Sequence, residues 1–496
     1  MRNSMHLTLI NVAAMKRKDF IMRVGLAGAG FSIVPRHVLG GKGFTAPSDT
    51  LYIGAIGAGG RGNDNLHQLA LHRNVKISHL CDVDERMVSR AKEAYPNAPY
   101  YKDYRKMLDS HDSEIDAIVV STPDHNHALQ TMAAIQRGMH VYVEKPLTHD
   151  IYEARILTEA AKKHKVVTQM GNYGSSGDGV RQMKEWLQAG IIGKAHTVYV
   201  WTNRPVWPQG ISWPTSPASV PEGLDWDLWL GTAPYKEYVE GLAPFNWRGW
   251  SDYGTGALGD MGCHLMETPF NVLDLGYPDR VECSVGAVYV DEFRRGEFPD
   301  GFPPSSHVVL RFPYQNGDFI KLHWMDGGIQ PARPEELEPD ELMGDGVNGV
   351  IIIGDRGKMM CDTYGRNARL LPTSLNDHVQ VPQTLPRVPE GHHHQWVNAC
   401  LAGYGEHELS SSFDIAGPLT ESVLMGNLAI RSYDYKEEYK ETYTEEGVEM
   451  ERTRTRYPGR GIQLLWDGPT MKVTNFEPAN AFVRRKYREG WSTGAL

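Results

Sequence analysis

The sequence predicts an α/β protein with two domains. Strand-like and helix-like segments alternate from 51 to about 171, and such alternation indicates a parallel sheet with helices on both faces. After Gly171 the pattern changes to short β-rich runs, two of which are separated by the hairpin signal Asn316-Gly317. We therefore expect a second, α+β domain whose open sheet is largely antiparallel.

A glycine-rich turn follows the first predicted strand, 51–57. It reads Gly57-Ala58-Gly59-Gly60-Arg61-Gly62, which matches G-x-G-x-x-G, and a helical pattern begins at 62. Gly57 allows the tight turn, Gly59 lets a pyrophosphate approach the backbone, and Gly62 lets helix and strand pack closely. The helix N-terminus offers free N–H groups to phosphates. We therefore predict a Rossmann dinucleotide-binding domain over 48–171, with Gly60 and Arg61 also at the cofactor.

An acidic residue ends the second predicted strand. Asp82 lies 20 residues after Gly62, where a carboxylate accepts hydrogen bonds from ribose hydroxyls and repels a 2′-phosphate. The sequence therefore favours NAD over NADP. The nearby cation Arg86 is the one feature that could weaken this preference.

Composition narrows the class of protein further. A chain of 496 residues is long for a single domain. Its formal net charge of −10 argues against a nucleic-acid-binding protein, because such proteins carry a basic surface. No apolar run approaches the roughly 20 residues that span a bilayer. The five cysteines form no C-x-x-C pair, which argues against disulfides and zinc. Adjacent histidines such as His392-His393-His394 do not converge on one ion, so we predict no metal site.

Residues 1–47 have the pattern of a leader. A basic region at 15–20 precedes an 11-residue apolar stretch, 24–34, which Pro35 ends. A basic region before a short apolar core indicates an export signal rather than an anchor. The pattern resembles a twin-arginine signal, with Lys18 in place of the second arginine. We expect an exported, periplasmic protein; a cytoplasmic enzyme with a frayed N-terminal helix is the alternative.

The remaining elements follow from periodicity. In the first domain, strands are predicted at 75–82, 115–121, 139–143 and 166–169, with helices at 62–72, 85–95, 103–109, 125–137 and 150–163. In the second domain, 172–435, helices are predicted at 180–189, 395–402 and 419–433, with strands at 195–202, 280–290, 306–312, 318–324, 350–354 and 358–361. Residues 436–496 form a C-terminal extension.

Two polar loops follow predicted strands of the parallel sheet. They are Ser121-Thr122-Pro123-Asp124-His125-Asn126-His127 and Glu144-Lys145-Pro146. Because ligand loops lie at the carboxyl ends of such strands, both should line one crevice with the glycine turn. We expect Thr122, Pro123 and His127 to contact the cofactor. Lys145 is placed to bind the nicotinamide side and a substrate hydroxyl, although a surface lysine in a turn is the simpler alternative.

A second cluster lies in the glycine-dense run 254–264. Asp260 and His264 are four residues apart, so on a helix they share a face. Oxidation of an alcohol requires a base for the hydroxyl proton, and histidine titrates in a useful range. Asp260 could orient the imidazole or bind a neighbouring hydroxyl. From the residues alone, a structural Asp–His pair is the more common interpretation of this spacing.

These motifs together resemble the Gfo/Idh/MocA family of NAD(P)-dependent oxidoreductases, many of which act on sugars or cyclitols. The resemblance covers about 48–435 and rests on the glycine turn, the loop 122–127, Glu144-Lys145-Pro146 and the segment 259–264. The tail from Leu464 to Trp491 resembles an exported bacterial subgroup. The family's second domain, an open sheet, commonly mediates oligomers, so the resemblance implies a homo-oligomer.

The resemblance also assigns roles to individual residues. It implies that Lys145 is catalytic and that Asp260 and His264 lie across the substrate, with His264 as the proton acceptor. Glu144 and Asn172 would contact the cofactor. Seven tryptophans between 201 and 250 could stack on sugar rings or belong to the core, and the sequence leaves both open.

We therefore expect an NAD-dependent dehydrogenase acting on a secondary alcohol of a sugar, glycoside or cyclitol. Because free NAD is scarce outside the cytoplasm, the NAD would stay tightly bound and be recycled by a second substrate. Two alternatives remain: a glycosidase that uses bound NAD for transient oxidation and elimination, and a non-catalytic sugar-binding protein.

Overall fold

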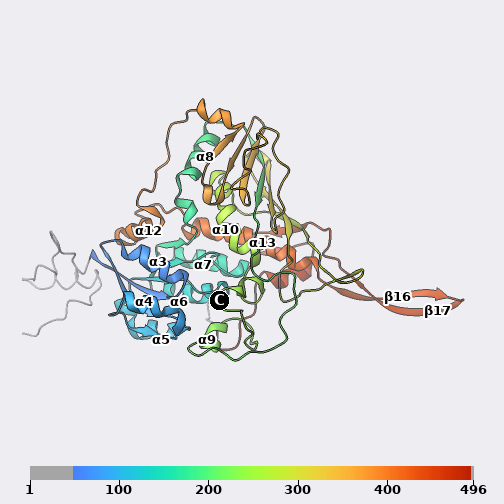
Figure 1. The fold of residues 1–496 in the computed structure, drawn as a ribbon, viewed down its shortest axis with the longest axis horizontal. Coiled ribbons are helices and arrows are strands. Elements are labelled where there is room, and N and C mark those ends of the chain that lie inside the picture. Colours follow the sequence, from blue (N-terminus) through green and yellow to red (C-terminus); the bar gives the residue numbers. More distant parts are fainter. Residues whose placement is uncertain (1–48, 493–496) are drawn as a thin grey trace, which may run out of the picture.

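A computed structural model describes residues 49–492 (Figure 1). The leader predicted over 1–47 lies outside the described residues. Within 49–492, no helix combines the length and apolar character needed to cross a membrane.

The first domain contains a parallel sheet of six strands in the order β3-β2-β1-β4-β5-β6, as expected of a Rossmann domain. Its strands are β1 (Leu51–Ile56), β2 (Val75–Cys81), β3 (Tyr100–Tyr101), β4 (Ala117–Val120), β5 (His140–Val143) and β6 (Thr168–Met170). Its helices are α3 (Arg61–Ala70), α4 (Glu85–Ala94), α5 (Tyr104–His111), α6 (Asp124–Gln136) and α7 (Ile151–His164). Every residue of β4 is buried, because helices cover both faces of the sheet.

The second domain contains a sheet of nine strands in the order β15-β14-β13-β7-β12-β11-β8-β18-β19. Its strands are β7 (Ala195–Trp201), β8 (Arg280–Val285), β11 (Ser306–Pro313), β12 (Phe319–Met325), β13 (Gly349–Gly354), β14 (Lys358–Cys361), β15 (Arg369–Leu371), β18 (Leu464–Asp467) and β19 (Lys472–Val473). Only β7 and β12 pair in parallel within this sheet. The predicted largely antiparallel sheet is confirmed.

Short helices pack on this sheet. They are α8 (Asp178–Gln188), α10 (Gly256–Leu265) and α11 (Glu267–Val272). The predicted strand 280–290 is divided, because β8 ends at Val285 and β9 (Tyr289–Asp291) pairs with β10 (Arg294–Arg295) in a separate ribbon.

Two late helices join the domains. α12 (Gly391–Ala402) packs on α3 and β1, and its Trp396 is fully buried in the core of the first domain (Figure 1). α13 (Phe413–Tyr433) packs on α7 and on β8. The predicted start of this helix at 419 is wrong by six residues. Proline is unfavourable inside helices, yet Pro418 is the sixth residue of α13.

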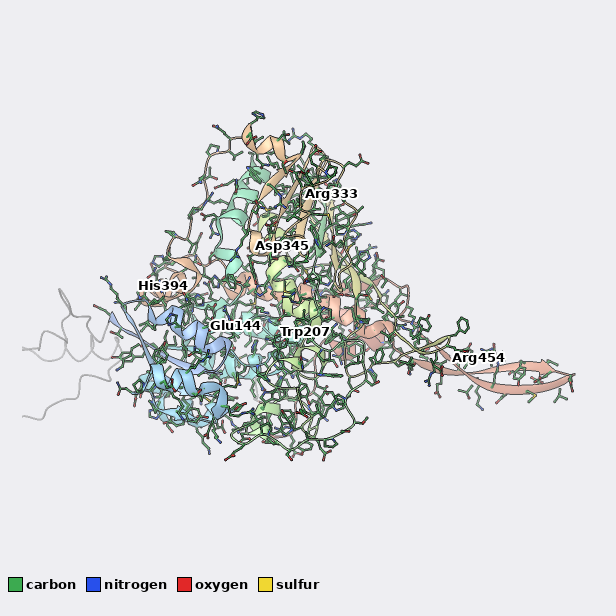
Figure 2. The ribbon with its side chains drawn as sticks, in the orientation of Figure 1. Glu144, Trp207, Arg333, Asp345, His394 and Arg454 are labelled. Carbon is green, nitrogen blue, oxygen red and sulfur yellow. The ribbon has the colours of Figure 1, made fainter. Side chains whose placement is uncertain are left out.

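The C-terminal extension has three parts. β16 (Glu437–Glu445) and β17 (Val448–Arg456) form a two-stranded ribbon that projects from the body and carries Arg454 (Figure 2). β18 and β19 then join the edge of the large sheet beside β8. After the 3-10 helix at 477–482, the last described residues cross onto the first domain, where the Tyr152 N–H donates to the Val483 carbonyl at 3.1 Å.

An aromatic segment, 202–253, folds back onto the first domain. It contains the short helix α9 (Trp226–Leu230) and a small core of its own that includes Trp226, Trp229 and Trp250. Its backbone bonds to the loop after β2, since the Asp225 N–H donates to the Val83 carbonyl at 2.9 Å. This segment therefore covers the carboxyl edge of the parallel sheet.

Candidate active site

A cavity runs along the carboxyl edge of the parallel sheet and reaches α10 of the second domain. Glu144, labelled in Figure 2, lies on its wall near the boundary between the domains. The cavity brings together most of the residues predicted from sequence: Gly57, Gly59, Gly60, Arg61, Asp82, Thr122, Pro123, Glu144, Lys145, Asp260 and His264. One continuous space thus connects the glycine turn to the Asp-His pair.

The glycine turn has the geometry that a dinucleotide requires. Gly57 adopts a positive φ of 80°, which favours glycine. A Cβ on Gly59 would lie 2.6 Å from the Cβ of Met87, and a Cβ on Gly62 would lie 1.8 Å from the Gly57 carbonyl oxygen. Helix α3 begins at Arg61, directly after the turn. The residues present therefore fit a pyrophosphate at the N-terminus of this helix.

Asp82 lies at the end of β2 and faces the turn. Its Oδ2 accepts from the Gly59 N–H at 2.8 Å, and its Oδ1 accepts from the Asp84 N–H at 2.9 Å. Burial raises the pKa of the Asp82 carboxyl to about 6. The nearby cation is engaged elsewhere, because Arg86 donates to Asp84 from Nε at 2.8 Å and from a terminal nitrogen at 2.6 Å.

Glu144 forms the centre of the cavity wall. Its Oε1 accepts from Arg61 Nε at 3.0 Å and from Asn65 Nδ2 at 2.9 Å. Burial opposes ionisation, but the attraction of Arg61 and these hydrogen bonds outweigh it and lower the pKa of Glu144. The carboxylate thus ties α3 to the end of β5 and stays charged beside Lys145.

Lys145 and Asp260 form a part-buried ion pair across the domain boundary. Lys145 Nζ lies 2.8 Å from Asp260 Oδ1 and 3.1 Å from the Asp260 carbonyl oxygen. Arg248 Nε also donates to Oδ1, at 3.2 Å. Burial would raise the pKa of Asp260, but the two cations lower it well below its usual range. The ammonium of Lys145 is therefore fixed at the cavity wall by an ionised partner.

His264 follows Asp260 by one turn of α10 and is 6% exposed. Its ring lies 4.9 Å from the Tyr364 ring and 5.9 Å from the Tyr173 ring, measured between centroids, and its Nδ1 has no hydrogen-bond partner. Burial and the charge of Lys145 lower the pKa of His264 to about 3. The imidazole is therefore neutral at physiological pH and has the form of a proton acceptor.

Three predicted cofactor residues lie behind the wall rather than on it. Gly62 packs under the turn. The buried ring of His127 lies 2.8 Å from the Pro146 carbonyl and 2.7 Å from the Thr122 carbonyl, so it ties the two polar loops together. Asn172 is buried and accepts from Ser411 Oγ at 2.5 Å. Its neighbours Gly171 and Tyr173 line the cavity instead.

The opposite wall comes from residues outside the predicted motifs. They are Leu228, Trp229, Trp247 and Arg248 of the aromatic segment, Tyr364, and Trp491 of the C-terminal tail. Trp229 and Trp247 among them belong to the tryptophans for which the sequence left sugar stacking and core packing open. Most tryptophans of the aromatic segment are buried in cores, and Trp229 and Trp247 combine burial with a place on the wall. Trp207, labelled in Figure 2, is buried away from the cavity lining.

The first turn of α6, which follows β4, holds this aromatic wall in place. His125 Nε2 lies 3.0 Å from the Trp229 carbonyl oxygen, and Thr255 Oγ1 donates to Asp124 Oδ2 at 2.6 Å. The Asp124-His125-Asn126 sequence could have indicated this contact, since polar residues that are buried, as these three are, require hydrogen-bond partners.

The histidine triplet does not converge. The Nε2 atoms of His392, His393 and His394 lie beside Met170, Asn65 and Gln68, respectively. A different group, His79, His111 and Glu114, brings three potential ligand atoms within 4.8 Å of one another. None of these three residues lines the cavity.

Comparison with known families gives two matches along the chain. Residues 51–172 match the Gfo/Idh/MocA model described as "Oxidoreductase family, NAD-binding Rossmann fold". Residues 176–289 match the companion model described as "Oxidoreductase family, C-terminal alpha/beta domain".

Curated relatives carry two kinds of name. A "Glycosyl hydrolase family 109 protein" of Solibacter usitatus is 29% identical over 196 residues, 36% of this chain and 43% of that protein. The "Myo-inositol 2-dehydrogenase" of Thermotoga maritima is 25% identical over 189 residues, 38% of this chain and 54% of that protein. The chain thus matches about half the length of these relatives.

Solved structures share the fold. GenD2 from gentamicin A biosynthesis, in complex with NAD, aligns with a TM-score of 0.50 and 18% identity over 86% of this chain and 99% of that one. Levoglucosan dehydrogenase with NADH and levoglucosan aligns with a TM-score of 0.50 and 17% identity over 75% of this chain and 96% of that one.

Proposed function

Because the chain belongs to the Gfo/Idh/MocA oxidoreductase family, whose N-terminal domain binds nicotinamide nucleotides, we propose that it is a dehydrogenase of sugars, glycosides or cyclitols. The observation that carries this proposal is the single cavity that joins the glycine turn to Lys145, Asp260 and His264. A secondary alcohol held there would lie between a cation and a neutral imidazole.

Lys145, Asp260 and His264 would each have a different role in the oxidation of an alcohol. A nicotinamide, when bound, supplies the hydride acceptor. Lys145 orients the substrate oxygen and stabilises the negative charge that develops on it, while Asp260 holds the ammonium in place. His264 accepts the hydroxyl proton, because it is neutral and faces the same cavity. The aromatic wall excludes water from the reacting atoms.

The direct test uses protein that carries bound NADH, with free nucleotide removed. Purified protein loaded with NADH is mixed with a panel of keto sugars and inosose-type cyclitol ketones, and absorbance at the reduced-nicotinamide band is followed. We expect at least one ketone to oxidise the bound NADH and to yield the corresponding alcohol. If no ketone on the panel changes the absorbance of bound NADH, dehydrogenase activity on this class of substrate is excluded.

We propose NAD as the physiological cofactor, because Asp82 lies where the ribose hydroxyls bind and Arg86 is engaged by Asp84. Asp82→Asn removes the charge but keeps an acceptor. We expect the preference for NAD over NADP to fall by about 10- to 100-fold, since like-charge contact with a 2′-phosphate is lost. Fluorescence titration with both nucleotides measures this ratio.

The matched control for Asp82→Asn is Glu93→Gln, which alters an exposed carboxylate of α4 that does not line the cavity. This variant should keep the wild-type preference. An unchanged ratio in Asp82→Asn would show that selectivity lies elsewhere.

Binding of NAD should also depend on pH near 6. Burial raises the pKa of Asp82 to about 6, and ribose hydroxyls bind the carboxylate better than the acid. NAD binding is then linked to loss of a proton. Affinity should be constant above pH 7 and fall below pH 6, by about 10-fold at one unit below the pKa. Titrations between pH 5 and 8 test this, and Asp82→Asn should abolish the dependence.

A second function is supported by the family 109 relatives. In that case the same residues would oxidise a ring hydroxyl to a ketone with NAD, remove the acidified adjacent C–H proton, eliminate the aglycone, add water to the resulting double bond and return the hydride from NADH to the ketone. Chromogenic glycosides separate the two proposals. Release of free sugar without net change in NADH supports the glycosidase, whereas net NADH formation without release supports the dehydrogenase.

We further propose that the protein is exported and keeps its cofactor. The basic and apolar pattern of 1–47 supports export. Fractionation of the source cells tests the location, and nucleotide content after extended dialysis tests retention. Complete loss of the nucleotide on dialysis would contradict retention.

A further inference from the structure

The last described segment, residues 483–492, is fastened to the first domain by buried charges. Arg485 donates to Glu153 Oε1 from Nε at 3.0 Å and from Nη2 at 2.7 Å, and the Glu153 side chain is 1% exposed. The Arg485 backbone N–H donates to Asp150 Oδ2 at 3.0 Å. Tyr487 adds a hydrogen bond to Glu153 at 2.5 Å. Buried, hydrogen-bonded ion pairs of this kind fix a segment in one place.

The same segment then crosses to the aromatic wall. The Arg488 backbone N–H donates to the Thr232 carbonyl at 3.1 Å, and its Nε donates to the Gly231 carbonyl at 3.1 Å. Its guanidinium also binds Asp227 of α9, at 2.5 Å. The tail therefore links α7 of the first domain to α9 of the aromatic segment and spans the edge of the cavity.

Trp491 lies at the end of this path and lines the cavity. It is 8% exposed, and the guanidinium carbon of Arg105 lies 4.4 Å from its ring centroid. The cavity residues from the neighbouring strand end are Lys102, Asp103 and Tyr104, which follow β3. Since β3 is adjacent to β2, where Asp82 marks the ribose, Trp491 lies at the adenosine end.

We propose that residues 483–492 close the adenosine end of the nucleotide site, with Trp491 as a cofactor-contacting residue. This inference depends on one part of the proposed function, namely that the cavity binds a nicotinamide nucleotide. Trp491 supplies aromatic surface to the adenosine half, while Arg485 and Arg488 keep the tail in position. Release of NAD then requires this end of the cavity to open, which slows dissociation of the nucleotide.

The test is Trp491→Ala in the full chain, with NADH dissociation measured by fluorescence after a chase with excess NAD. We expect release to be roughly 10- to 100-fold faster, since loss of a base–aromatic contact has effects of this size. Trp491→Phe should stay close to the wild type. Affinity for ADP-ribose should fall in parallel, whereas affinity for nicotinamide mononucleotide should not change.

The matched control is Arg484→Ala. This residue belongs to the same segment, and its guanidinium carbon lies 4.0 Å from the Tyr152 ring centroid, but it does not line the cavity. It should release NADH at the wild-type rate. Equal release rates in Trp491→Ala and the wild type, at comparable thermal stability, would overturn the inference while leaving nucleotide binding intact. A wild type that binds neither NADH nor NADPH would instead overturn the proposed function.

Discussion

Lys145→Met is expected to lower kcat by about 10³-fold while nucleotide affinity changes by no more than a few fold. The ammonium lies 2.8 Å from Asp260 Oδ1 at the cavity wall, where it can hold the substrate oxygen and stabilise developing negative charge. Methionine keeps the volume of the side chain but loses the charge and the three donors. Steady-state kinetics with the best substrate, together with NADH titration, measure both effects.

Two further variants define what the lysine contributes. Lys145→Arg keeps a positive charge in a planar, permanently protonated group. If its kcat is higher than that of Lys145→Met, the loss of kcat in Lys145→Met is due to the missing charge rather than to a missing proton transfer. Lys236→Met removes a lysine that binds Asp252 at 2.8 Å and Asp300 at 2.7 Å but does not line the cavity. It should leave kcat unchanged. Wild-type kcat in Lys145→Met would remove this residue from the mechanism.

Local patterns were sufficient to predict the parallel sheet. β1 and β4 appear in sequence as apolar runs because both faces are covered, and each is followed by a loop with a distinct polar motif. β3 was missed because it is only two residues long and lies at the sheet edge, where little burial is needed. The sheet of the second domain was predicted in the same way, from alternating strands such as β11, whose buried and part-exposed residues alternate.

The site was predictable only on the side that carries motifs. Strand ends converge by topology, so the glycine turn and Lys145 could be placed together without knowledge of the rest of the chain. His127 shows the limit of this reasoning, because a loop motif does not determine which side of the loop a side chain faces. Its ring ties Thr122 to Pro146 inside the wall.

The other wall depends on long-range packing. Trp247 lies in a segment without helical or strand periodicity, and Trp491 lies at the cavity in a tail that is held by distant partners; one of them is Glu153, a carboxylate more than 300 positions before its partner Arg485. A buried arginine with a distant carboxylate partner leaves no local pattern. Such contacts are therefore found only once the chain is folded.

His264→Asn is expected to lower kcat by about 10²- to 10⁴-fold, the range for loss of a general base, while NAD remains bound. Asparagine retains a polar side chain of smaller volume but cannot accept the proton. The pKa of His264 is lowered to about 3, because burial and then the charge of Lys145 disfavour the imidazolium. The imidazole therefore remains neutral as pH falls through 6.5, and kcat/KM should show no acidic limb from His264 near that value.

The two residues should also be coupled. Removing Lys145 takes away the second-largest cause that lowers the pKa of His264, so in Lys145→Met this pKa should rise and an acidic limb should move toward neutral pH. The double variant Lys145→Met/His264→Asn should lose less than the product of the single losses, because both residues act on the same substrate oxygen in the same step. His323→Asn alters a part-buried histidine on β12 outside the cavity lining and serves as the control.

Losses that multiply in the double variant would mean that the two residues act independently. A His264→Asn protein that retains most of its activity would show that His264 is not the proton acceptor. A non-catalytic sugar-binding protein would show no turnover in any of these variants, including the wild type.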